Sequence, residues 1–254
     1  MNPSTITIRD CESHDDCQVC VDLQRSVWSV GEVDLTPAAI FLIAQRTGGQ
    51  ALCAFDGTKP VGFVLAFFAR GHFRGNDSNP DPGRPYWHSH MVGVLPEYQN
   101  RGVGQALKLR QREEALRRGI STIEWTFDPL QLRNAHFNIA RLGAIVRRYI
   151  PNCYPETASP LHAGLPADRI VAEWRLPTPS LSAAVTMEGQ VEVPIASNIG
   201  ELRIANPIAA REIQAALRQR LTELLGSGYS ITGFRKGTVT CHYLLCVLPE
   251  PHGT

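Results

Sequence analysis

The sequence lacks the features that mark several classes of protein. Its 254 residues contain no apolar run near the ~18 residues that a membrane-spanning helix needs, so we expect no membrane span. The opening MNPSTITIRD has no basic segment followed by an apolar one, and we expect no secretory signal. The net charge of +1 and the scatter of Lys and Arg exclude a concentrated basic face, so no nucleic-acid partner is expected. One local cluster of arginines is typical of the solvated face of a helix, and it consists of Arg110, Arg112, Arg117 and Arg118.

The sequence contains seven cysteines, an odd number, at irregular positions. Without an export signal we expect reduced thiols and a cytoplasmic location. Cys17 and Cys20 have the spacing of a zinc-binding pair, with Cys11 and His14 nearby, but no second pair follows at a matching distance. Free thiols on a helix are therefore favoured over a metal site, and no metal is expected.

The spacing of apolar residues predicts seven strands and four helices in the larger, N-terminal part of the chain. Hydrophobic residues make up 43% of the sequence, enough for a sizeable core. Strands that neighbour one another early and alternate with helices later favour an α/β (α+β) fold, a mixed sheet with helices on both faces. The expected strands are 5–9, 50–55, 61–69, 87–95, 122–127, 144–150 and 170–176, and the expected helices are 13–28, 37–46, 101–118 and 132–142.

Two irregular segments organise the chain. Residues 71–86 are rich in Pro, Gly and Asp and predict a long loop, while residues 177–189 read as a linker. Beyond the linker we expect a strand, a helix and two more strands, at 191–195, 206–226, 229–234 and 239–247. The predicted organisation is a domain over 1–178 and a small α+β extension over 179–254. The extension could cover the sheet, complete a site or form the contact of a homodimer.

The segment Gln99-Asn100-Arg101-Gly102-Val103-Gly104 follows a predicted strand and opens a predicted helix. The first N–H groups of a helix have no partner within it, and the helix dipole adds partial positive charge there. Together they suit an anion such as pyrophosphate. Gly102 and Gly104 let the backbone approach phosphates closely, and two glycines in a first helical turn need a reason, because each costs ~1 kcal/mol relative to Ala.

In this context the sequence resembles the GNAT superfamily of N-acetyltransferases. The signature Gln/Arg-x-x-Gly-x-Gly/Ala is met by Gln99–Gly104, and the order of elements agrees over roughly residues 5–176. The phrases HSHMVGVLPEYQNRGVG, WTFDPLQLRNAHFN and LPADRIVAEW are similar to a bacterial subfamily of predicted acetyltransferases with a C-terminal extension. The resemblance implies a split between the strands that bear Val92 and Trp125, in which the pantetheine arm of coenzyme A lies.

The resemblance also implies which residues bind the donor. Backbone groups of Val92 and Val94 would bind the pantetheine arm. An asparagine on the helix after the next strand often touches the cofactor in this family, and Asn134 and Asn138 are the candidates here. The turn around the pyrophosphate would consist of Gln99, Asn100, Arg101, Gly102, Val103, Gly104 and Gln105.

Acyl transfer to an amine requires the free amine, whereas an ammonium group of pKa ~10 keeps its proton at neutral pH. Some family members place a carboxylate eleven residues before the signature glutamine, and that position here is His88. His88 and His90 share one face of the strand, as do Val92 and Val94. An imidazole of ordinary pKa ~6.5 suits a base, and two half-exposed strand histidines without a chemical role are the alternative.

Other candidates for proton transfer lie further along the chain. Glu124 and Asp128 are second-line bases. Many family members protonate the leaving thiolate with a tyrosine four residues before the glycine that ends this helix, but Ile139 occupies that position. Tyr149 or Tyr154 could replace it.

The expected function is therefore an acyl-CoA-dependent N-acyltransferase acting on the amine of a small molecule such as an amino acid. Acetyl-CoA is the family's usual donor. Succinyl-CoA is an alternative donor, because it carries the same pyrophosphate and the motif cannot distinguish the two. A protein N-acetyltransferase is one alternative. A non-catalytic acyl-CoA sensor is another, which Ile139 favours.

Overall fold

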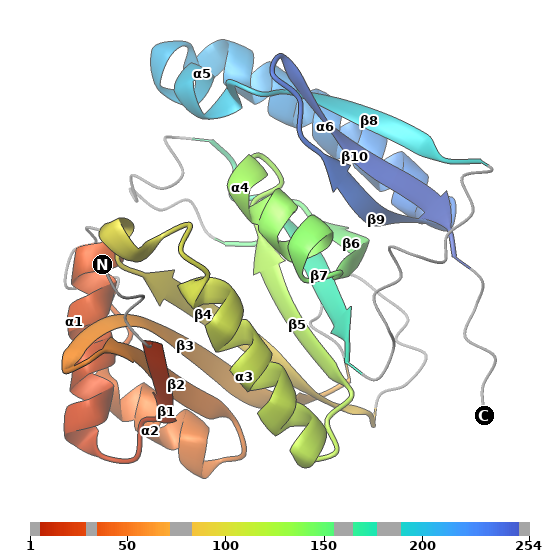
Figure 1. Ribbon diagram of the computed structural model, residues 1–254. Helices are drawn as coiled ribbons and strands as arrows, with labels where there is room; N and C mark the ends of the chain where they lie inside the picture. The colour runs from red at the N-terminus through yellow and green to blue at the C-terminus, as the bar shows by residue number, and fades with distance from the viewer. Residues whose placement is uncertain (1–5, 29–34, 72–82, 155–164, 177–188, 249–254) are drawn as a thin grey trace. The chain divides into compact units, whose positions relative to one another are not determined.

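A computed structural model describes residues 6–28, 35–71, 83–154, 165–176 and 189–248 (Figure 1). They form two compact units that divide between Glu124 and Trp125. The described elements are β1 (Ile6–Asp10), α1 (His14–Trp28), α2 (Ala38–Arg46), β2 (Gln50–Asp56), β3 (Lys59–Arg70), β4 (Pro85–Val94), the 3₁₀ turn η2 (Pro96–Tyr98), α3 (Val103–Arg117), β5 (Thr122–Phe127), α4 (Leu132–Ala135), the π-helical η3 (His136–Arg141), β6 (Ile145–Ile150), β7 (Arg169–Arg175), β8 (Val191–Ala196), α5 (Ile199–Ala205), α6 (Pro207–Gly226), β9 (Tyr229–Arg235) and β10 (Thr240–Val247).

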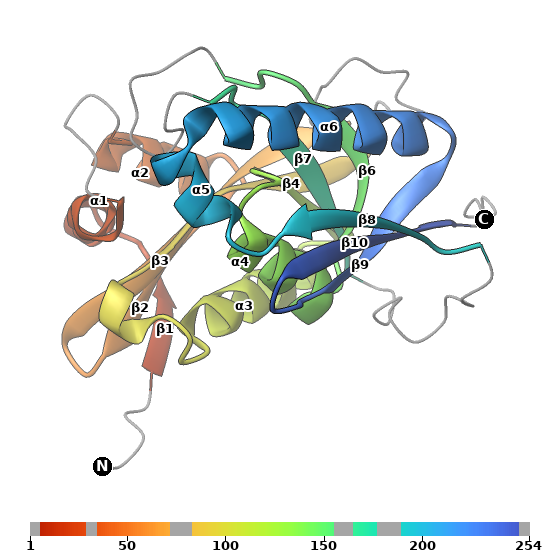
Figure 2. The ribbon, with the colours of Figure 1, turned by 90° about the horizontal axis from the view of Figure 1, so that it is seen from above.

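The first unit is a sheet with helices on both faces, as the sequence predicts. Strands β1 to β4 pair antiparallel in chain order. The start of β5 then pairs parallel to β4, with Trp87 opposite Ile123 and His88 opposite Glu124. Helices α1 and α2 lie on one side of β2 and β3, and α3 lies on the other (Figure 2).

Helix α2 begins differently from its prediction. Pro37, expected at the first helical position, is the residue before the helix, and no side chain caps this end. Thr36, the residue before this proline, binds Gln24 of α1 through its backbone. Its N–H donates to the Gln24 side chain at 2.9 Å, and its carbonyl accepts from that side chain at 3.0 Å. A buried amide from α1 therefore fixes the entry to α2.

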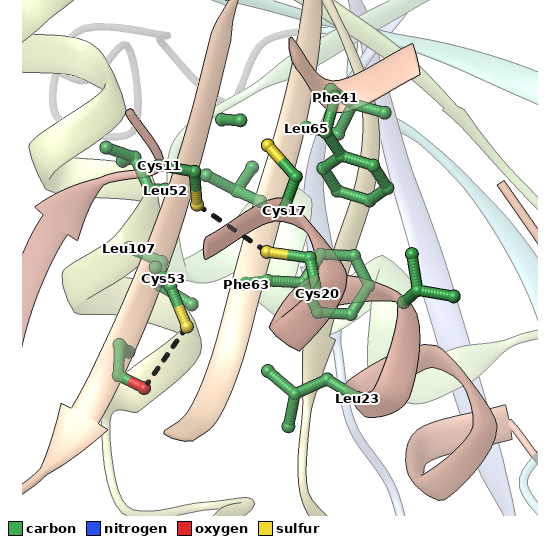
Figure 3. Close-up of a cluster of buried hydrophobic side chains, with 14 of the residues drawn as sticks. Cys11, Cys17, Cys20, Leu23, Phe41, Leu52, Cys53, Phe63, Leu65 and Leu107 are labelled. Carbon is green, nitrogen blue, oxygen red and sulfur yellow. Dashed lines mark hydrogen bonds between the residues drawn. The ribbon is translucent and has the colours of Figure 1, made fainter. Parts of the chain in front are cut away.

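Four cysteines lie in the core of the first unit (Figure 3). Cys11, Cys17, Cys20 and Cys53 are buried among apolar side chains such as Phe63. The sulfur atoms of Cys11 and Cys20 are 3.6 Å apart. Burial raises the pKa of the Cys17 thiol to about 11. The described residues hold no group of three or more side chains arranged to bind a metal ion.

The second unit has a sheet in the order β5-β7-β6-β9-β10-β8. Strands β6 and β7 pair antiparallel, and β6 pairs with β9 where Val146 lies opposite Ile231. Helix α6 covers one face of this sheet, and α4 with η3 lies on the other (Figure 2). The expected C-terminal extension thus shares a sheet with residues before it. The predicted boundary at residue 178 lies outside the described residues and stays a prediction.

A buried carboxylate links this extension to the strands before it. Asp168 is fully buried and accepts two hydrogen bonds from Arg218 of α6, at 2.8 and 2.9 Å. The Tyr149 hydroxyl donates to the same carboxylate at 2.6 Å, and the Asn152 N–H donates at 3.1 Å. These bonds compensate the cost of burying the charge.

The mixed α/β fold and most element bounds confirm the predictions, with three corrections besides the start of α2. Strand β4 begins at Pro85, inside the segment expected to be a loop, while 72–82 of that loop lie outside the described residues. Helix α5 was not expected. The helix expected over 132–142 changes to π-helix at His136. Of the expected linker, only Gly189 is described. No described helix is long and apolar enough to span a membrane.

Candidate functional site

Strand β4 carries a β-bulge at its second histidine. The pairing with β3 passes from Ala66 opposite Ser89 to Leu65 opposite Met91, so His90 is an extra residue in β4. The rings of His88 and His90 are 6.2 Å apart. An extra residue bends a strand and redirects the side chains around it.

The bulge changes which residues share a face of β4. The His90 ring lies 5.5 Å from Phe67, which is on the same face of β3 as Phe63, and Phe63 packs on Phe41 of α2. The two histidines therefore face the side of α1 and α2. Ser89 instead contacts Lys108 of α3. On that side too, a Cβ placed on Gly62 would lie 3.3 Å from both Val94 and Leu107, a residue of α3.

His88 and His90 share a face, and Val92 and Val94 share a face, as expected. Strict alternation would place all four residues on one face of β4, and that part of the expectation is wrong. The register places Val92 opposite Val64 and Val94 opposite Gly62. The two pairs lie on opposite faces of β4, because the extra residue inverts the alternation between them.

The two histidines are neutral at pH 7. Burial lowers the pKa of His88 to about 4, helped by His90 and Lys108 and opposed by the carboxylate of Glu124. Partial loss of water also lowers the pKa of His90, which remains the more exposed of the two. Glu124 is fully buried and lies opposite His88 in the sheet. The ordinary pKa expected from the sequence does not apply to His88, which is neutral at pH 7 and can accept a proton, but as a weaker base than an exposed histidine.

The turn after β4 has the backbone shape that an anion site needs. Asn100 (φ 60°) and Gly102 (φ 84°) both adopt the left-handed conformation. A Cβ on Gly102 would meet open space, so the positive φ rather than crowding favours glycine there. Where left-handed residues alternate with other backbone conformations, successive N–H groups point into the same hollow. Such hollows bind phosphates.

The start of α3 adds further N–H donors. The first bond of the helix runs from the Ala106 N–H to the Gly102 carbonyl, at 2.9 Å. The N–H groups of Val103, Gly104 and Gln105 precede this bond and have no partner within the helix. Val103 is buried in the core and anchors the helix start, while Gln105 is exposed. The residues present therefore fit a pyrophosphate group.

The β2–β3 hairpin holds the turn in place. The Tyr98 hydroxyl donates to Asp56 at 2.8 Å, and Lys59 pairs with Glu97 at 3.0 Å. The guanidinium of Arg101 stacks over the Tyr98 ring at 5.4 Å. This support was not predicted, because Glu97 and Tyr98 lie some forty residues from the hairpin in sequence.

Gln99, the first residue of the signature, also has a local role. Its side-chain amide donates to the carbonyl of Val94 at 3.1 Å. The side chain thus links the end of β4 to the turn. The backbone of Val94 is expected to bind pantetheine, and its carbonyl already has this partner.

The remaining predicted site residues lie in the second unit. Asn134 is exposed on α4, and Asn138 is buried in η3. Ile139 is a core residue, so no acid stands at the position of the family's usual tyrosine. Tyr149 donates its hydroxyl to Asp168, and burial, together with this contact, raises the pKa of Tyr149 far above its usual range. A role for Tyr149 as an acid would require that bond to break.

Asp128, a second-line base, also has a structural contact in this unit. Its carboxylate pairs with Arg203 at 2.8 Å and accepts a bond from the Leu130 N–H at 2.8 Å. Both members of the ion pair are buried. Asp128 therefore holds α5 against the segment after β5, a contact that sequence alone does not reveal.

Three solved structures with a similar fold are acetyltransferases. The ribosomal-protein-S18-alanine N-acetyltransferase from Escherichia coli matches with a TM-score of 0.50 and 16% identity over 73% of this chain and 98% of its own. NAA60 from Arabidopsis thaliana, solved with acetyl-CoA, matches at 0.50 and 14% over 67% and 99%. An aminoglycoside 6'-acetyltransferase type Ii matches at 0.50 and 21% over 69% and 99%.

At these identities the structural matches establish a shared fold. A search of curated proteins found no match. Residues 18–143 match the model of the acetyltransferase (GNAT) family, and this range includes the β4 histidines, the turn and all of α3. The chain therefore contains an acetyltransferase domain of the GNAT family.

Proposed function

We propose that this protein transfers an acetyl group from acetyl-CoA to the amine of a small molecule, such as an amino acid. The observation that carries the proposal is the turn into α3, with its two left-handed residues and three helix N–H groups that precede the first intrahelical bond. Acetyl-CoA, when bound, supplies the acetyl group as a thioester. Succinyl-CoA would use the same turn.

The backbone would contribute most of the donor contacts. N–H groups from Asn100 to Gln105 face the pyrophosphate, and Arg101 adds a positive charge beside it. Backbone groups of Val92 and Val94 would bind the pantetheine arm, and Gln99 would hold the turn against β4. Contacts from Asn134 and Asn138 remain predictions.

Deprotonation of the acceptor is assigned to the β4 histidines. His88 accepts the proton as a neutral imidazole, and the buried carboxylate of Glu124 stabilises the imidazolium that results. His90, exposed at the bulge, would contact the incoming amine or relay its proton. Tyr149 is a less favoured acid than water for the departing thiolate, because its hydroxyl already binds Asp168.

One pair of variants tests the donor site with a matched control. Gly102→Glu places bulk and negative charge at the turn, whereas Gly119→Glu places them beyond the far end of α3. Both glycines have positive φ and open space around an added Cβ, so the backbone strain is comparable. Calorimetry should show that only Gly102→Glu abolishes CoA binding. Equal CoA affinity in both variants, with the fold intact, would remove the basis of the assignment.

A second experiment identifies the acceptor. Release of CoA thiol from acetyl-CoA and succinyl-CoA is measured with amino acids, other small amines and peptides with free N-termini. Turnover with small amines supports the proposal. Turnover with peptides alone would instead indicate a protein N-acetyltransferase, and tight acetyl-CoA binding without turnover would indicate a sensor.

A further inference from the structure

Helix α3 carries a buried lysine behind the β4 histidines. Lys108 is 2% exposed, and its Nζ donates to the Ser89 hydroxyl at 3.0 Å and to the Gln111 side chain at 2.7 Å. Burial holds the pKa of Lys108 well below its usual range. A methionine of similar length would fill this space without the cost of desolvating an amine, so packing alone does not explain a lysine here.

The partner of Lys108 lies at the centre of the site. Ser89 is 4% exposed and stands between His88 and His90, immediately before the extra residue of the bulge. Its side chain points to α3, whereas both imidazoles point to the other face of the sheet. The bond to Lys108 therefore holds β4 from behind, at the one residue between the two histidines.

The same helix begins at the donor turn. Lys108 is five residues beyond Val103, a rise of about 7.5 Å along the helix axis. Because a helix is stiff over this length, a bond from Lys108 to β4 fixes the distance between the turn and the histidines. Pairing with β3 sets the register of β4, and the bond to Lys108 adds a second anchor at the residue next to the bulge.

We propose that Lys108 is a positioning residue that, through Ser89, sets the β4 bulge and the two histidines in register with the donor turn. The predicted effect on kcat rests on the proposed function. The predicted effect on the position of the β4 bulge and its histidines does not. Besides burial, the largest cause, His90 on β4 and the protonated form of Lys108 lower the pKa of His88, while Glu124 on β5 raises it.

The test uses the full chain with two variants and a control. Lys108→Met keeps the volume and removes the amine, and Ser89→Ala removes only the hydroxyl. Lys236→Met changes an exposed lysine of the second unit. Each variant is assayed for kcat, for KM of acetyl-CoA, for acetyl-CoA affinity by calorimetry and for the titration of the His88 imidazole by NMR.

We expect Lys108→Met to lower kcat about 10- to 100-fold, the range for a misplaced catalytic group, while acetyl-CoA affinity changes less than about twofold. The pKa of His88 should rise, because a neighbour that opposes its protonation is gone. Ser89→Ala should also lower kcat. The kcat of the double variant should be no lower than that of Lys108→Met, and Lys236→Met should have the kcat of wild type.

The outcomes separate this inference from the proposed function. Wild-type kcat in Ser89→Ala would overturn the inference, even if Lys108→Met failed to fold. A parallel fall of kcat and acetyl-CoA affinity in Lys108→Met would also overturn it. If wild type itself turned over no amine, the proposed function would fail, and the NMR titration would still decide whether Lys108 acts on the β4 histidines.

Discussion

The low pKa of His88 predicts how the stability of the fold depends on pH. An ordinary histidine titrates near 6.5, whereas His88 titrates at about 4 in the folded chain. The difference of about 2.5 pH units corresponds to about 3 kcal/mol at most. Folding therefore disfavours the protonated imidazole. The contribution of neutral His88 to the free energy of unfolding is fully present above pH 6.5. It is lost as the pH falls from 6.5 through about 4.

His88→Gln removes this titration and keeps a polar side chain on β4. Urea unfolding followed by circular dichroism at pH 7, 5.5 and 4.5 measures the free energy of unfolding. Between pH 7 and 4.5 wild type should lose about 2.5 kcal/mol more than His88→Gln does. His14→Gln, at an exposed histidine, should keep the wild-type dependence.

NMR titration of the imidazole provides an independent check on the same reasoning. A His88 signal that titrates near 6.5 would refute it, because the folded and unfolded pKa values would then be equal. An identical pH dependence of unfolding in wild type and His88→Gln would refute it as well.

Two further predictions concern activity and the second unit. His88→Ala should lower kcat about 10²- to 10⁴-fold at pH 7 but much less at pH 9, because free amine becomes abundant near its pKa of ~10, and a constant ratio across pH would indicate a structural role for His88. Arg218→Met should lower the free energy of unfolding by about 3 kcal/mol, because Asp168 then stays buried without its ion pair. Arg220→Met, which removes an exposed pair with Glu223, should change it by less than about 0.5 kcal/mol in the same urea titration, and equal losses would contradict this account.

The parts of the site that sequence could predict are those encoded by local chemistry. Glycine at position 102 indicates a positive φ. The turn is located by the apolar strand before it and the amphipathic helix after it. The strand over 122–127 was predicted to the residue, since Ile123, Trp125 and Phe127 alternate with more polar residues. Such features depend on neighbours in sequence, which are visible without a structure.

The parts that sequence could not predict depend on distant partners. The bulge at His90 arises from pairing with β3, and no turn residue marks it. Lys108 looks like one more solvated cation of a basic helix, yet it is buried by contact with Ser89. Helix α5 is short, and the buried Arg203–Asp128 pair that holds it joins residues 75 apart.

The contacts between the turn and the β2–β3 hairpin also bear on binding thermodynamics. Tyr98, Glu97 and Arg101 already have fixed partners before any ligand arrives. A preorganised loop loses little conformational entropy when a phosphate docks, so more of the contact energy remains as affinity. Affinity for the donor is therefore set partly by Asp56 and Lys59, two residues of a surface hairpin that need not touch the donor at all.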